Sequence, residues 1–146
     1  MDEYYWTKED FAAVEKSTAL SELLAVAMAV IARMPAPVSL VSGPISTGGS
    51  GNRDQNIKIF SETIRAVKES GATVFNQIPF EQKFGELAAA SDLPYFQPIL
   101  EEFFMPFFQS GKIAEIIFMK NWQTSTGARW EHEIAQKLGI KIRFLF

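Results

Sequence analysis

A carboxylate and several small polar residues lie close together near the C-terminus of the sequence. Residues 125–131 read Ser-Thr-Gly-Ala-Arg-Trp-Glu and begin a pattern at helical spacing that Gly139 ends. Ser125 is a typical helix N-cap, which puts Glu131 on the first or second turn of the helix. A carboxylate there can act as a nucleophile. It can also complement the positive end of the helix or form half of a capping box, so the spacing alone leaves its role open.

Two further segments carry polar groups that could bind a ligand. Residues 42–52 are rich in Gly and Ser and precede a predicted helix, whose N-terminal N–H groups would suit an anion. The segment is neither a Walker loop nor a dinucleotide fingerprint, because the Gly-Lys-Ser/Thr ending and the glycine spacing are missing. A flexible surface connection is the alternative interpretation. Asn76 could hydrogen-bond a base or a sugar, or it could form a turn.

The composition excludes several other chemistries. The 146 residues include no cysteine and one histidine, so thiolate catalysis, cysteine-based zinc sites and a Ser-His-Asp triad are poor candidates, and we expect no metal and no cofactor. A net charge of −3 with scattered Lys and Arg gives no footprint for a nucleic-acid polymer.

The same composition suggests where the protein resides. The acidic start argues against a secretory signal, and the apolar stretch at residues 23–31 is too short to span a bilayer. We therefore expect a cytoplasmic protein with no membrane partner.

Strands and helices alternate along the chain. Apolar runs predict strands at residues 38–45, 72–75, 113–119 and 140–146, and helical patterns cover residues 53–70, 79–90, 97–110 and 125–138. This order predicts a Rossmann-like or flavodoxin-like three-layer α/β sandwich with a parallel sheet of four to five strands. We assign residues 1–37 to an N-terminal helical extension and residues 38–146 to the α/β domain. Because ligands of such sheets bind beyond the carboxyl ends of the strands, the polar segments should meet there.

The side chains of two helices allow more specific predictions. In the helix over residues 125–138, we expect Trp130, Ile134 and Leu138 to face inward, and His132 and Glu133 to face solvent. In the helix over residues 97–110, four Phe residues form an apolar cluster that indicates a core or a subunit interface. They are Phe103, Phe104, Phe107 and Phe108. A protein whose aromatic helix and N-terminal extension serve mainly in assembly is one hypothesis that follows.

Two motifs, taken in order, resemble the nucleoside 2-deoxyribosyltransferase superfamily. Residues 42–49, Ser-Gly-Pro-Ile-Ser-Thr-Gly-Gly, follow the first α/β strand and are similar to the superfamily's opening segment. Residues 125–140, Ser-x-Gly-x-x-Trp-Glu-x-x-x-Ala-x-x-Leu-Gly-Ile, are similar to its catalytic helix. The resemblance covers residues 38–146.

The resemblance implies cleavage or transfer at the N-glycosidic bond of a nucleoside or a deoxynucleoside 5′-monophosphate. By position, Glu131 would be the nucleophile that forms a glycosyl-enzyme, which water or a second base resolves. Ser125 and Gly127, with the backbone of residues 43–49, would hold the 5′-phosphate or 5′-hydroxyl. The expected substrate-binding residues are Ser42, Gly43, Ile45, Ser46, Gly48, Gly49, Asn76, Ser125 and Gly127. The resemblance also implies a homo-oligomer.

The chain departs from the superfamily pattern in its carboxylates. The superfamily usually has an Asp shortly before or at the third strand, whereas residues 103–112 contain no carboxylate and Glu115 falls inside the predicted strand. The alternative hypothesis is therefore a catalytically weak or inactive nucleotide-binding or sensing module of the same fold. An enzyme is our leading expectation, and a second carboxylate beside Glu131 would favour it.

Overall fold

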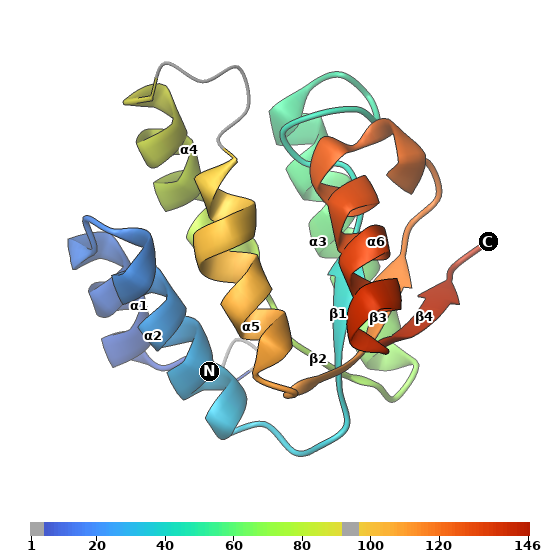
Figure 1. Cartoon of the computed structure of the whole chain (residues 1–146), viewed down its shortest axis with the longest axis horizontal. Coiled ribbons are helices and arrows are strands. Elements are labelled where there is room, and N and C mark those ends of the chain that lie inside the picture. Colours follow the sequence, from blue (N-terminus) through green and yellow to red (C-terminus); the bar gives the residue numbers. More distant parts are fainter. Residues whose placement is uncertain (1–4, 92–96) are drawn as a thin grey trace. The chain divides into compact units, whose positions relative to one another are not determined.

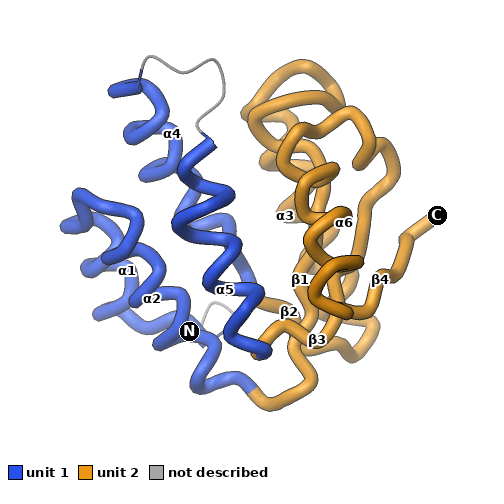
Figure 2. Tube along the Cα trace, viewed as in Figure 1, with its two compact units in different colours: residues 1–34, 76–111 blue, residues 35–75, 112–146 orange. Residues whose placement is uncertain are grey.

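The computed structural model describes residues 5–91 and 97–146 of the chain. The chain forms two compact units, each built from two stretches of sequence (Figure 2). Unit 1 combines residues 1–34 with residues 76–111, and unit 2 combines residues 35–75 with residues 112–146. The predicted N-terminal helices are thus grouped with a segment from the middle of the chain.

Unit 2 contains a parallel four-stranded sheet with the strand order β2-β1-β3-β4. The strands are β1 (Val38–Ser42), β2 (Thr73–Val74), β3 (Ile113–Phe118) and β4 (Lys141–Phe144). All five residues of β1 are buried, as expected for a central strand that is covered on both faces.

Two helices of unit 2 cover the sheet, and they complete three layers. Helix α3 (Arg53–Glu69) joins β1 to β2, and helix α6 (Thr126–Leu138) joins β3 to β4. Because the two crossovers run in opposite directions along the sheet, right-handed connections place the helices on opposite faces. Figure 1 shows α3 behind the strands and α6 in front of them. The predicted Rossmann-like three-layer α/β fold with a parallel sheet is confirmed.

Unit 1 is helical and has an aromatic core. Its elements are α1 (Lys8–Lys16), α2 (Leu20–Ala32), the 3-10 helix η1 (Ile78–Phe80), α4 (Glu81–Ala89), the π-helix η2 (Ile99–Phe104) and α5 (Met105–Gln109). The four Phe residues of η2 and α5 are all buried. Phe103 lies edge-on to Phe80 and to Phe84, with ring centroids 5.0 Å apart in each pair. These rings therefore belong to the core of unit 1.

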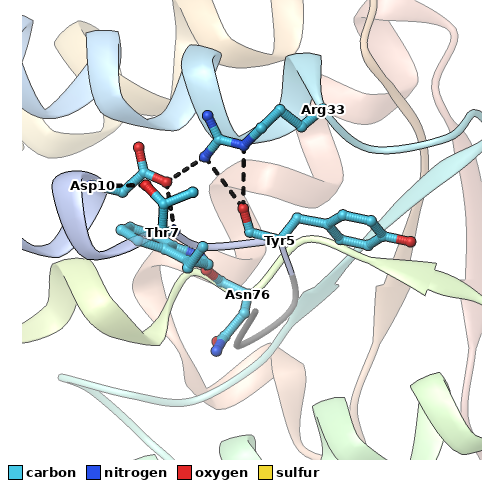
Figure 3. Close-up of polar contacts among 6 residues, drawn as sticks. Tyr5, Thr7, Asp10, Arg33 and Asn76 are labelled. Atoms are coloured by element: carbon cyan, nitrogen blue, oxygen red, sulfur yellow. Dashed lines mark hydrogen bonds and ion pairs between the residues drawn. The ribbon is translucent and has the colours of Figure 1, made fainter. Parts of the chain in front are cut away.

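A polar network ties residues 5–10 to other segments of unit 1 (Figure 3). Thr7 and Asp10 cap α1 reciprocally, each side chain accepting a hydrogen bond from the other's backbone N–H. Arg33, just after α2, pairs with Asp10 and donates to the carbonyl of Tyr5. The indole of Trp6, which is 1% exposed, donates to the carbonyl of Asn76 at 3.1 Å.

The structure corrects two details of the predicted α6 packing. Leu138 is 40% exposed rather than inward, because it is the last residue of the helix, where the chain turns at Gly139. His132 is half-buried rather than solvated, since its ring stacks on Trp122 at 4.5 Å and lies edge-on to Phe118 at 5.2 Å.

Strand β1 also ends earlier than predicted, at Ser42 instead of residue 45. Pro44 lacks the N–H that a central strand would use in its ladder, which accounts for this end. Over residues 5–91 and 97–146, no helix is long and apolar enough to cross a membrane.

Candidate active site

Helix α6 brings Glu131 to the carboxyl ends of the strands. The helix begins at Thr126, with Ser125 as its N-cap, and ends at Gly139, whose φ of 72° is the left-handed conformation that glycine adopts without strain. Its buried residues are Ala128, Glu131, Ile134 and Ala135. Glu131 lies on the second turn and is 6% exposed. A carboxylate on an otherwise apolar helix face is costly to bury unless other groups stabilise it.

Strand β1 supplies one of the groups that stabilise Glu131. Side chains alternate along β1, so Ser42 and Leu40 face α6 while Ser39 faces the opposite side. The hydroxyl of Ser42 donates to Oε1 of Glu131 at 2.5 Å, and Ser42 is 0% exposed. The serine that we expected to contact substrate thus contacts the proposed nucleophile.

The loop of residues 43–52, which we call the glycine loop, packs tightly beside this pair. A side chain at Gly43 would come within 2.5 Å of the sulfur of Met119. Gly48 has a φ of +74°, and a Cβ there would lie 2.1 Å from the carbonyl oxygen of Thr124. Asn56, which is 4% exposed on α3, donates to the carbonyls of Ile45 and Gly48. These contacts give the loop a defined conformation, unlike the flexible connection considered above.

Hydrogen bonds also join the glycine loop to the start of α6. The N–H of Gly49 donates to the hydroxyl of Thr124 at 2.8 Å, and the N–H of Thr126 donates to the hydroxyl of Thr47 at 2.8 Å. The N–H of Ala128 donates to the hydroxyl of Ser125 at 3.1 Å. The loop and the helix start therefore form one connected structure at this edge of the sheet.

This arrangement leaves three donors that a ligand could use. Thr47 and Ser125 act as acceptors in the bonds above, and neither hydroxyl donates to another residue within the described part of the chain. The first turn of a helix has N–H groups without intrahelical partners. Gly127 is the second residue of α6, so its N–H is one of these groups. Two O–H groups and one N–H group at a helix N-terminus suit an anion or a hydroxyl group.

The other predicted binding residues fall into two groups. Gly43, Ile45, Ser46, Gly48 and Gly49 belong to the glycine loop in unit 2, where Gly43 is buried and Ser46 is exposed. Asn76 belongs to unit 1, and its side chain accepts from the N–H of Ile78 at 3.1 Å, which is the turn considered as its alternative role.

The sequence analysis did not predict the roles of three residues that hold the glycine loop and the start of α6 in place, namely Thr47, Thr124 and Asn56. Each uses its side chain to bond a backbone group outside its own element, 75 and 79 residues away for the two threonines and 11 residues away for Asn56. Isolated Thr and Asn residues in a loop or on a helix carry no local signal for such contacts.

Glu115 does not lie with Glu131. It pairs in register with Ser39 and Lys141, on the face of the sheet opposite to α6. Its Oε1 accepts from Ser39 at 3.1 Å and from Arg143 at 2.9 Å, and Lys141 lies 3.6 Å from Oε2. Burial works to raise the pKa of Glu115, but Arg143, with help from Ser39 and Lys141, holds that pKa below its ordinary value. This carboxylate is an ionised member of a charge network.

A cavity of about 310 Å³ lies near Glu115, toward the amino ends of the strands. Pro37, Ser39, Thr73, Glu115 and Lys141 contribute to its lining. Ligands of open parallel sheets bind at the carboxyl ends instead, so the cavity is not part of the site around Glu131. Within the described ranges, no three His, Asp or Glu side chains are grouped as a metal site would require.

Comparisons with known proteins give one match. A family model described as Domain of unknown function (DUF4406) matches residues 38–144. No curated protein and no solved structure matches the chain.

Proposed function

We propose that unit 2 of this chain, which belongs to the DUF4406 family, acts on nucleosides or nucleotides. The family's description assigns no activity. The reaction is cleavage or transfer at the N-glycosidic bond of a (deoxy)nucleoside or its 5′-monophosphate, with Glu131 as the nucleophile. The proposal extends the resemblance of residues 42–49 and 125–140 to the nucleoside 2-deoxyribosyltransferase superfamily.

The observation that carries this proposal is the position of the Glu131 carboxylate. It lies at the ligand-binding edge of a parallel sheet, it is 6% exposed, and it accepts a 2.5 Å hydrogen bond from Ser42. A hydrogen bond of this kind favours the ionised form, which is the form that attacks carbon. Burial strengthens its attraction to the positive charge that develops on the sugar.

In the first step, an oxygen of Glu131 forms a bond to the anomeric carbon while the bond from that carbon to the base nitrogen breaks. The base leaves with the bonding electron pair and takes a proton from solvent. In the second step, water or another base attacks the same carbon and loses a proton to solvent, while the bond from that carbon to the Glu131 oxygen breaks and frees the carboxylate, so the configuration is retained overall. Water makes the protein a hydrolase, and a second base makes it a transferase.

The sugar would be oriented by donors at the start of α6. The hydroxyls of Ser125 and Thr47 and the N–H of Gly127 provide hydrogen bonds for a 5′-hydroxyl or a 5′-phosphate. The positive end of the α6 dipole adds to the attraction for a phosphate.

One observation favours the second candidate function, a nucleotide-binding module with weak or no catalysis. Glu115, the carboxylate of β3, bonds Arg143 and Ser39 on the face away from α6, so it cannot assist Glu131. Without help from Glu115, departure of the base depends more on its own basicity or on solvent.

The test is a panel of nucleosides and 5′-monophosphates incubated with the protein, with and without an acceptor base, and analysed by chromatography for free base. Free base without an acceptor indicates a hydrolase, and free base only with an acceptor indicates a transferase. Saturable binding without release supports the binding module. If the protein neither binds nor cleaves any compound of the panel, both candidates are overturned.

Two further expectations concern the oligomeric state and the cellular location of the protein. A homo-oligomer is expected, and light scattering on the purified protein measures it directly. A cytoplasmic location is expected as well, and cell fractionation tests it.

A further inference from the structure

Ser42 is a polar residue whose surroundings allow it only one kind of role. It is 0% exposed, so its hydroxyl cannot contact a ligand from solvent, and that hydroxyl donates to Oε1 of Glu131 at 2.5 Å. Its side chain contacts Glu131, so we look for its effect on a reaction through that carboxylate.

We infer that Ser42 is the positioning residue of the nucleophile: its hydroxyl fixes the orientation of the Glu131 carboxylate and keeps it ionised. This inference rests on the proposed function. It replaces the substrate-binding role that the sequence suggested for Ser42.

Two physical arguments support this role. Ser42 is the last residue of β1, where it pairs with Phe118 of β3 and its carbonyl accepts from the N–H of Met119 at 2.9 Å, so its hydroxyl is held by ordered backbone. A carboxylate on a helix can rotate about its side-chain bonds, and a donor on rigid backbone removes that freedom before substrate arrives. A donor to the charged form also lowers the cost of keeping that charge buried.

The same strand provides a matched control. Ser39, three residues earlier, also donates to a carboxylate, that of Glu115 at 3.1 Å, but on the opposite face of the sheet. Loss of the Ser39 hydroxyl removes a comparable bond from the same strand without touching Glu131.

The experiment measures kcat and KM against pH for the wild type, Ser42→Ala, Ser42→Cys, Ser42→Thr and the control Ser39→Ala. We expect Ser42→Ala to lower kcat by about 10- to 100-fold, with KM changed by less than about threefold. The acidic limb of the profile should move to higher pH. Ser42→Cys keeps a donor on the same atom of the side chain, although the thiol is larger and a weaker donor, so its effects have the same direction and a smaller size. Ser42→Thr keeps the hydroxyl and should restore part of kcat, whereas Ser39→Ala should match the wild type.

A second measurement keeps this inference separate from the proposed function. Carbon-detected NMR titration follows the Glu131 carboxyl, whose signal is identified by its loss in Glu131→Gln. The titration midpoint should be higher in Ser42→Ala and in Ser42→Cys than in the wild type. An unchanged midpoint, or a change in KM alone, would overturn the role of Ser42. A wild type that releases no base overturns the proposed activity, and the titration still decides whether Ser42 controls this carboxylate.

Discussion

Two glutamates of unit 2 each accept a hydrogen bond from a serine of β1, yet their surroundings differ. Glu115 lies toward the amino ends of the strands, where Arg143 and Lys141 from the edge strand β4 balance its charge. Glu131 lies at the carboxyl ends, on α6, and its bond to Ser42 is 2.5 Å long. The two cations stabilise the charge of Glu115 and so make it a poor nucleophile. This contrast is why we place the proposed chemistry at the carboxyl ends of the strands.

The largest expected difference between the two ends is catalytic. Glu131→Gln and Glu131→Ala should lower base release by about 10³-fold or more, because they remove the nucleophile. Glu115→Gln should change it by less than about twofold. Glu133→Gln is the control on the same helix, since Glu133 is exposed and pairs with Lys137 at 3.2 Å. Base release by Glu131→Ala at the wild-type rate would remove Glu131 from the mechanism.

The next difference concerns the packing of the two ends. Gly48 and Gly71 both have positive φ, but a Cβ at Gly48 meets the carbonyl oxygen of Thr124 at 2.1 Å, while nothing lies within 4 Å at Gly71. Gly71→Ala should cost about 1–2 kcal/mol for its backbone conformation. Gly48→Ala should cost about 2 kcal/mol more, because the backbone must also move. Urea denaturation measures both, and equal losses would mean that the glycine loop is not tightly packed.

A third prediction separates a helix cap from a ligand contact. Ser125 and Thr7 each cap a helix by accepting from a backbone N–H, at 3.1 Å and 3.2 Å. Alanine at either position should lower the free energy of unfolding by about 1 kcal/mol. Ser125→Ala alone should raise KM, and more for a 5′-monophosphate than for the nucleoside. If the two substrates respond equally, Ser125 does not contact the phosphate.

The smallest expected effect is the response of Glu115 to acid. Its folded-state pKa lies below the ordinary value of 4.5, so its contribution to stability is present above about pH 4.5 and is lost as the pH falls through the folded-state pKa. Because Arg143 and Lys141 are open to solvent, screening keeps this contribution to about 1 kcal/mol or less. The stability gap between wild type and Glu115→Gln should be widest at neutral pH and should narrow below pH 4.5. A gap that stays constant across this range contradicts the charge network.

Local patterns were sufficient for the order of the elements and for part of the site. The apolar run at residues 38–42 and the glycine after α6 predict a strand and a helix end without any tertiary information. The N-cap role of Ser125 follows from its residue type and from the helix that comes next. These features depend on neighbours in sequence, so the sequence by itself determined them, along with the three-layer α/β class.

Only the tertiary structure decided which distant groups meet. The bonds from Ser42 to Glu131 and from the backbone of Thr126 to Thr47 join residues 89 and 79 positions apart. It also decided that Glu115 joins Arg143 on the face away from α6, because the strand register sets the partners of each side chain. A hydroxyl or a carboxylate has the same local signature whether it binds a ligand, a backbone group or another side chain. Its role therefore depends on contacts that form only when the chain folds.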